Sequence, residues 1–188
     1  MSAPPSRPAA GRRSARPERA PVARVADFDV LDQTHREVVA QLARLAELVA
    51  HLDRHGVDAP ARTMAREIAT FFNGHARAHH ADEEARVFPP LLADGAPELV
   101  QHVQRLQQDH GWLEEDWLEL APQLEAVADG YSWYDLAMPQ HALPIFTVLF
   151  RDHISLEETL VYPEAKRRQA ALDAGERARV TPPAPSSS

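Results

Sequence analysis

Four stretches of the chain repeat apolar residues at intervals of three and four, with polar residues between them. This spacing places the apolar side chains on one face of an α-helix. The stretches cover about residues 29–54, 58–88, 97–129 and 132–162, and only short segments connect them. No stretch alternates apolar and polar residues as a strand would. The pattern predicts an all-α fold, an up-down-up-down antiparallel four-helix bundle.

Residues that commonly begin or end helices mark the boundaries of these stretches. Asp58 is a natural N-cap for the second helix, and a Ser-x-x-Asp sequence that resembles a capping box begins at Ser132. Pro89 and Pro163 should end the second and fourth helices, because proline lacks the amide hydrogen that a helix interior requires. These signals support four separate helices.

Both ends of the chain lack apolar periodicity. Residues 1–26 are rich in Pro, Ala, Arg and Ser, and residues 169–188 have a similar polar composition. We expect both to form disordered tails, with one domain at 27–168. Six of the arginines fall in residues 1–24 against a single acid, so the rest of the chain is more acidic than its net charge of −8 indicates. That balance argues against a nucleic-acid-binding protein.

The composition also limits the chemistry. The chain has no cysteine, which excludes disulfides, thiolate zinc sites and cysteine-bound iron–sulfur clusters, and leaves ten histidines as nitrogen ligands. No apolar run approaches the roughly 18 residues of a membrane span, and the arginine-rich start lacks the apolar core of a secretory signal. We expect a soluble, cytoplasmic protein that does not bind a membrane.

One eleven-residue pattern occurs twice. From His79 and again from His153 the chain contains His-x-x-x-Glu-Glu-x-x-Val, followed by an aromatic residue and Pro. Residues four apart lie on one face of a helix, so a histidine nitrogen and the first glutamate can reach one metal ion. Two such copies on two helices are typical of a carboxylate-bridged two-metal site inside a helical bundle.

The other two predicted helices each carry one histidine on the apolar face, His35 and His110. Counting about 1.5 Å per residue from the helix ends brings all four histidines near one level of the bundle. Burying so many polar groups without a metal would be costly. Glu83 and Glu157 are the expected bridges, and the pairing of histidines with ions stays open. The predicted metal ligands are His35, His79, Glu83, His110, His153 and Glu157.

The first copy of the pattern allows two registers, because His80 and Glu84 are also four apart. The second copy has Ile154 at the place of His80, which favours His79 and Glu83 as the ligands. In this register we expect Glu84 and Glu158 to be surface groups or hydrogen-bond partners of the ligands.

These histidines and the two Val-aromatic-Pro copies resemble the hemerythrin-like (HHE) cation-binding domain over about residues 27–168. The resemblance implies an up-down-up-down four-helix bundle that holds two non-haem iron ions, bridged by carboxylates and by an oxo group. The family includes O2 carriers, O2 and redox sensors, and proteins that respond to nitrosative stress or repair iron centres.

The chain departs from the oxygen-carrying members at two points. They have a second histidine four residues from the first in the third helix, whereas Leu106 and Glu114 flank His110 here. Their fourth-helix carboxylate is an Asp five residues after its histidine, whereas Glu157 follows His153 by four. The chain therefore looks more similar to the branch with four histidines and two glutamates.

Fewer protein ligands leave more open positions on iron. We therefore expect a protein that binds or reacts with O2, NO or peroxide in redox or nitrosative stress or in iron handling, with an unidentified protein redox partner.

His75 and Glu114 are candidates for additional ligands or for a role beside the ligands. A reversible O2 carrier or sensor without turnover and a metal-free helical interaction module are the alternatives, and whether the protein is an enzyme stays open.

Overall fold

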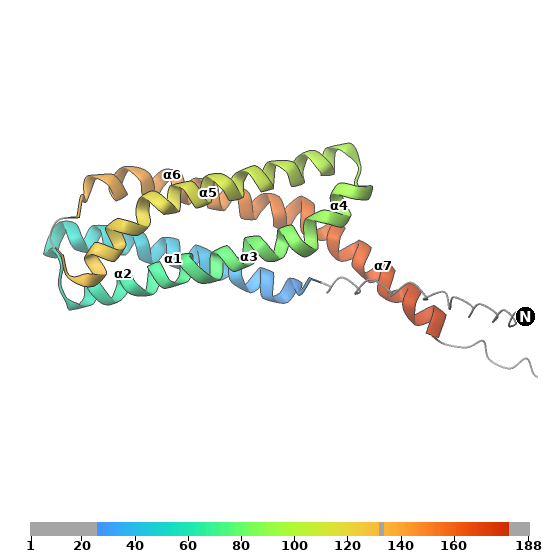
Figure 1. Ribbon diagram of the computed structural model, residues 1–188, viewed down its shortest axis with the longest axis horizontal. Coiled ribbons are helices and arrows are strands. Elements are labelled where there is room, and N and C mark those ends of the chain that lie inside the picture. Colours follow the sequence, from blue (N-terminus) through green and yellow to red (C-terminus); the bar gives the residue numbers. More distant parts are fainter. Residues whose placement is uncertain (1–25, 132–133, 181–188) are drawn as a thin grey trace, which may run out of the picture.

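The computed structural model describes residues 26–131 and 134–180. All regular structure in this part of the chain is helical, so the predicted all-α fold is confirmed (Figure 1). Segments labelled η are π-helices, in which the backbone hydrogen bonds span one residue more than in an α-helix. The elements are α1 (Phe28–His55), α2 (Ala59–Phe71), η1 (Phe72–Ala76), α3 (Arg77–Asp82), η2 (Glu83–Val87), α4 (Phe88–Asp94), α5 (Pro97–Asp129), α6 (Ala137–Leu156), η3 (Glu157–Val161) and α7 (Tyr162–Val180).

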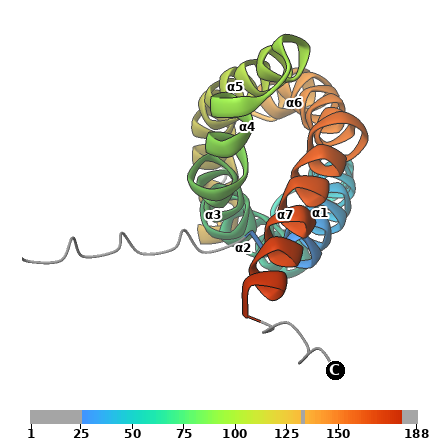
Figure 2. The ribbon, with the colours of Figure 1, turned by 90° about the vertical axis from the view of Figure 1, so that its right-hand side faces the viewer.

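These elements form four rods: α1, the run from α2 to α4, α5, and the run from α6 to α7. Neighbouring rods pack in a closed ring, because α2 contacts α1 and α5, and α6 contacts α5 and α1. The view along the bundle shows the four rods around a common interior (Figure 2). The predicted helical bundle is thus confirmed. No helix in the described part of the chain is long and apolar enough to cross a membrane.

Hydrogen bonds at the helix ends explain where the rods begin. The carboxylate of Asp58 accepts a bond of 2.9 Å from the backbone N–H of Ala61, as predicted for an N-cap. The predicted cap at Ser132 lies outside the described residues. In its place, Asp135 accepts a bond of 3.0 Å from the N–H of Ala137, the first residue of α6.

The predictions that Pro89 and Pro163 end helices were wrong, because both rods continue past the proline. In each rod a π-helix, η2 or η3, directly precedes the aromatic-Pro pair. The α-helical hydrogen-bond ladder is interrupted there, so each proline falls in the first turn of a new α-segment, where its missing N–H costs little. The repeated eleven-residue pattern therefore specifies a histidine on an α-helix, a π-segment from Glu to Val, and a restarted helix.

The disordered tail predicted from residue 169 was also wrong as far as residue 180, because α7 extends to Val180 and projects past the end of the bundle (Figure 1). The extension has no apolar stripe that a pattern search could detect. Polar contacts hold its beginning: Arg168 donates to Glu164 at 2.7 Å and to the backbone oxygen of Pro90 at 3.0 Å. A pair four residues apart stabilises a helix without apolar burial.

The apolar core has two parts. The larger cluster surrounds the rings of Phe72, Trp117 and Phe146, and the smaller one contains Phe88 and Tyr162 near the end where α4 and α7 begin. The buried polar side chains described below belong to neither cluster. The bundle is therefore apolar toward both ends and polar at one intermediate level.

Phe146 is fully buried, with its ring centroid 5.5 Å from that of Phe72 and 4.9 Å from that of Phe150. We expect Phe146→Ala to lower the free energy of unfolding by about 3–5 kcal/mol, because it leaves a cavity in the larger cluster. Urea denaturation measures the loss. The matched control is Ile145→Ala at the neighbouring position, which is 67% exposed and should change stability by about 0.5 kcal/mol or less. Equal effects of the two substitutions would contradict this account of the core.

Candidate metal centre

The six predicted ligands come together at the polar level of the bundle, and each is at most 6% exposed. They form two groups of four residues, and in each group one ligand atom from every residue lies within 4.8 Å of those of the other three. The first group is His35, His79, Glu83 and Glu157, and the second is Glu83, His110, His153 and Glu157. Both glutamates therefore belong to both groups.

The Nε2 atoms of the histidines face the two carboxylates. His35 Nε2 lies 3.0 Å from His79 Nε2 and 3.1 Å from Glu157 Oε2, and His153 Nε2 lies 3.2 Å from Glu157 Oε1. Glu83 Oε2 lies 3.4 Å from the Nε2 atom of His79. Two ligand atoms each about 2.1 Å from one metal ion, at right angles, are roughly 3 Å apart. The observed separations match those of ligands around an ion.

Unpaired buried atoms give a second test of whether these residues fit a metal. Among the described residues, Glu83 Oε2, both oxygens of Glu157, and the Nε2 atoms of His110 and His153 are buried without a hydrogen-bond partner. Buried polar atoms in native proteins nearly always have partners, and each unpaired one costs free energy. Cations between the carboxylates would satisfy all five atoms, so the donor set fits a metal centre.

The charges in the cluster lead to the same conclusion. Burial, together with the nearby negative charge of Glu83, raises the pKa of Glu157 well above its ordinary value. Burial also lowers the pKa of His79 to about 4, so this imidazole is neutral near pH 7 and can offer a lone pair. Burial acts to raise the pKa of Glu83, but His110 and His79 outweigh it and hold that pKa well below its ordinary value. Two carboxylates in contact repel unless a proton or a cation lies between them.

Each glutamate that belongs to both groups stands at a change of helix type. Glu83 is the first residue of η2 and Glu157 is the first residue of η3. The preceding α-helical turn places each glutamate four residues after its histidine, and the π-segment then changes the phase of the residues that follow. Local sequence thus positions the first acid, and the wider turn positions the second acid of each Glu-Glu pair.

The second acids bind histidines of neighbouring rods. The Nδ1–H of His35 donates to Glu158 Oε1 at 3.0 Å, and the Nδ1–H of His110 donates to Glu84 Oε1 at 3.0 Å. Both acids are about half exposed, with exposed fractions of 48% and 43%. Glu84 and Glu158 are therefore both surface groups and hydrogen-bond partners of the histidines, the two roles that the sequence offered as alternatives. A proton held on Nδ1 leaves the Nε2 lone pair directed into the cluster.

Tyr162, the aromatic residue of the second copy of the pattern, contributes to the cluster in a way that the sequence did not predict. Its hydroxyl donates to Glu83 Oε1 in a short hydrogen bond and lies 3.3 Å from His35 Nε2. The tyrosine ring stacks on the His35 ring, with the centroids 5.4 Å apart. It holds both side chains in place. The first copy has Phe88 at this position. The repeated pattern therefore predicted an aromatic residue here but not a hydroxyl group.

Asp109 is a buried acid that the sequence reasoning missed. It is 1% exposed, and its Oδ2 lies 3.9 Å from His153 Nδ1 and 3.7 Å from the Nε atom of Arg105. Its place directly before His110 was the available signal, since a charged residue beside the apolar stripe of a helix needs a partner. Asp109 is the acid nearest to the outer nitrogen of His153 among the ion pairs of the described residues.

His80 lies closer to the cluster than the register of the pattern predicted. Its nitrogen lies within 4.8 Å of nitrogens of His110 and His153. However, its ring stacks on that of His110, with the centroids 4.0 Å apart and an interplanar angle of 15°. Two parallel rings at this distance cannot both direct a lone pair at one ion. The structure therefore keeps His79, not His80, in the group with Glu83.

The two candidates for additional ligands or for a role beside the ligands belong to none of the metal-binding groups among the described residues. His75 is exposed, and its ring packs beside that of Phe71 at 5.7 Å. Glu114 forms an ion pair with Arg77 at the surface. His75 lies within the π-segment η1, whose altered phase removes it from the face that carries His79.

Comparison with known proteins agrees with this geometry. The model of the hemerythrin HHE cation-binding domain family matches residues 26–165. The chain is also similar to a protein of Haemophilus influenzae (strain Rd) described as uncharacterized. The two are 30% identical over 133 residues, which cover 71% of this chain and 75% of the other.

The contact between the two buried carboxylates leads to a test on metal-free protein. We expect Glu157→Gln to stabilise the chelator-treated chain by about 1 kcal/mol or more, because the neutral amide removes both the repulsion from Glu83 and the cost of holding a proton on Glu157 near pH 7. The same substitution should weaken metal binding. Urea denaturation with and without chelator measures both effects, and Glu47→Gln on an exposed position of α1 is the control. A destabilised metal-free variant would contradict the repulsion.

Proposed function

Because the chain belongs to the hemerythrin family of HHE cation-binding domains, we propose that its buried cluster holds two iron ions that bind or react with O2, NO or peroxide. One observation carries this proposal: the cluster consists of two four-residue groups that share both glutamates. A carboxylate that belongs to two ligand groups can bridge two ions. In the proposed fold the four rods alternate in direction, up-down-up-down.

In this arrangement Glu83 and Glu157 would be the carboxylates that bridge the two ions, together with an oxo group. Imidazole and carboxylate ligands suit iron, manganese and zinc, and the family relationship favours iron. From the two groups we also propose which histidines bind which ion, an assignment that the sequence left open. One ion takes His35 and His79, and the other takes His110 and His153.

A bound iron pair would supply up to two electrons and open coordination positions for a small oxidant. The side chains around it would keep the centre ordered and dry. Glu158 and Glu84 fix the rings of His35 and His110 through hydrogen bonds of 3.0 Å. The hydroxyl of Tyr162 donates a hydrogen bond to Glu83 Oε1, which orients that carboxylate. Burial of all six ligands limits the access of water.

Four histidines and two glutamates leave more open positions than the five-histidine set of oxygen carriers. This difference favours reaction with O2, NO or peroxide over simple storage. We therefore propose a role in redox or nitrosative stress or in iron handling, in the cytoplasm. Reversible O2 carriage or sensing is the second candidate, and it requires the same ligands without turnover.

The ligand assignment makes a prediction about iron content. We expect Glu83→Ala and Glu157→Ala each to remove a bridge and reduce iron from about two ions per chain to less than one. Glu158→Ala should retain the site but weaken metal affinity by about 10–100-fold, because it frees the ring of His35. Metal analysis after reconstitution, with titration against a competing chelator, measures both effects.

Two comparisons control this experiment. Glu47→Ala, on the exposed face of α1, should bind iron as the unmodified protein does. His79→Ala should lose iron while His80→Ala keeps most of it, because only His79 belongs to the group with Glu83. Two irons retained in both Glu83→Ala and Glu157→Ala would refute the bridging roles.

Anaerobic reconstitution with Fe(II), followed by O2 and then NO, tests the function itself. We expect optical bands of an oxo-bridged diferric pair and, once a chemical reductant is added to return the iron to Fe(II), consumption of the oxidant over several turnovers. Bands that bleach reversibly when O2 is removed would favour carriage or sensing. Failure of the chain to take up iron would overturn the proposal. Glu83→Ala/Glu157→Ala protein, treated in parallel, controls for iron bound elsewhere.

A further inference from the structure

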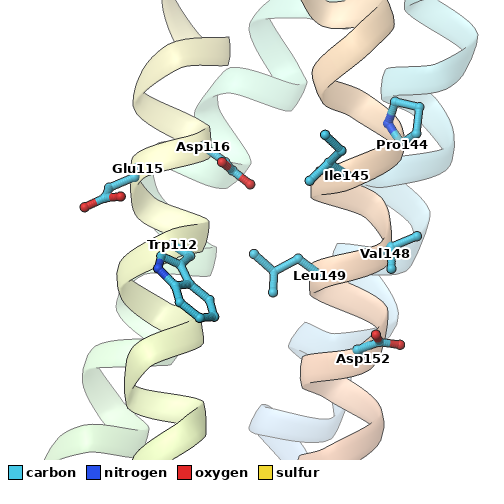
Figure 3. A pocket seen from close by; sticks show the side chains of 8 residues that line it. All are labelled: Trp112, Glu115, Asp116, Pro144, Ile145, Val148, Leu149 and Asp152. Atoms are coloured by element: carbon cyan, nitrogen blue, oxygen red, sulfur yellow. The ribbon is translucent and has the colours of Figure 1, made fainter.

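A groove that takes no part in the metal centre lies between α5 and α6 and has a volume of about 640 Å³. Figure 3 shows Trp112 of α5 and Leu149 of α6 extending toward one another across it, with Asp116 and Ile145 farther along the same gap. A groove of this size is within the range of sites that bind small molecules or short peptide segments.

The floor and walls of the groove are apolar and exposed. Trp112 is 48% exposed, Val148 is 58% exposed and Ile145 is 67% exposed. Single apolar residues on a surface need no explanation, but several that line one groove mark a site for another chain segment. The occupant therefore needs apolar side chains.

The rim of the groove is acidic. Glu115, Asp116 and Asp152 line it, and none of them has an ion-pair partner within the described part of the chain. Partial burial and the neighbouring charges of Glu119 and Glu115 raise the pKa of Asp116. The residues that line the groove include three acids and no basic side chain, so the occupant should supply positive charge.

The charge of the chain distinguishes between candidate occupants. Residues 1–24 contain six arginines and one glutamate, a net charge of +5, so the remainder carries −13 of the total of −8. Two acidic grooves facing each other in a dimer would repel. Residues 1–24 carry the needed charge, and their prolines, alanines and Val22 supply apolar contacts.

The N-terminal segment is long enough to reach the groove. It joins the bundle at Phe28, whose ring lies 5.4 Å from that of Tyr162 at the start of α7. Leu149 precedes Tyr162 by thirteen residues on the same rod, which corresponds to about 20 Å along the helix axis. An extended segment of 24 residues spans up to roughly 80 Å. The N-terminal segment is therefore longer than the distance that it must span to bind the groove of its own chain.

We infer that residues 1–24 bind in the α5–α6 groove of their own chain. Their arginines pair with Asp116, Asp152 and Glu115, and their apolar residues cover Trp112 and Ile145. Residues 1–24 then occupy the groove until a basic segment of another protein displaces them.

Cross-linking tests this directly, because the chain has no native cysteine. We expect Val22→Cys/Ile145→Cys protein to form an intramolecular disulfide at least about tenfold faster than Val22→Cys/Val39→Cys protein, because binding raises the local concentration of the thiol at the groove. Val39 is an exposed position of α1, closer in sequence to Val22, so the tether alone favours the control. Mass spectrometry of the full chain measures the rates.

Charge variants test the proposed chemistry. Glu115→Gln/Asp116→Asn/Asp152→Asn, or salt raised from about 0.05 to about 0.5 M, should abolish most of the rate advantage. Removal of three exposed charges elsewhere, Glu47→Gln/Asp53→Asn/Glu125→Gln, should preserve it.

Equal rates at Ile145 and Val39, or disulfides formed only between chains, would overturn the inference, as would an advantage that survives loss of the groove acids. Iron content is measured in the same samples. Because the groove residues are not among the proposed ligands, this inference and the proposed iron centre can fail independently.

Discussion

The contact between two buried carboxylates and four imidazoles determines the organisation of this bundle. Glu83 and Glu157 are fully buried and unpaired atoms surround them, so the interior at this level is unfavourable without a cation. The apolar clusters on either side of this level supply packing energy that offsets the cost of burying these polar groups. The bundle thus contains a group of buried polar side chains that lowers its stability when no metal is bound. Functional sites commonly cost a protein stability in this way.

The π-segments connect the repeated sequence pattern to this site. Both η2 and η3 begin at a glutamate shared by the two groups of the cluster, direct the next glutamate to the outer nitrogen of a histidine on a neighbouring rod, and end before an aromatic-Pro pair. Single-turn π-segments within α-helices are often found at functional sites. Here one local irregularity accounts for the double glutamate and for the proline inside a continuing rod.

The two halves of the site are similar but not identical. The hydroxyl of Tyr162 binds Glu83, whereas Phe88 at the equivalent position of the first copy has no hydroxyl. His80 stacks on His110, and Ile154 replaces it in the second copy. The group with His35 and His79 is therefore bounded by a phenol, and the group with His110 and His153 by an imidazole. Two metal ions held there would therefore have different surroundings.

The sequence by itself determined the features that depend on distances within one helix. The 3.6-residue period gave the four helices, and the i, i+4 spacing paired His79 with Glu83 and His153 with Glu157. Tertiary structure decided the contacts between rods, such as Glu158 with His35 across 123 residues, and the grouping of histidines around the glutamates. It also decided the π-segments and α7, which have no apolar signature. Contacts between rods depend on the rotation and tilt of each helix, and packing of the whole core sets these.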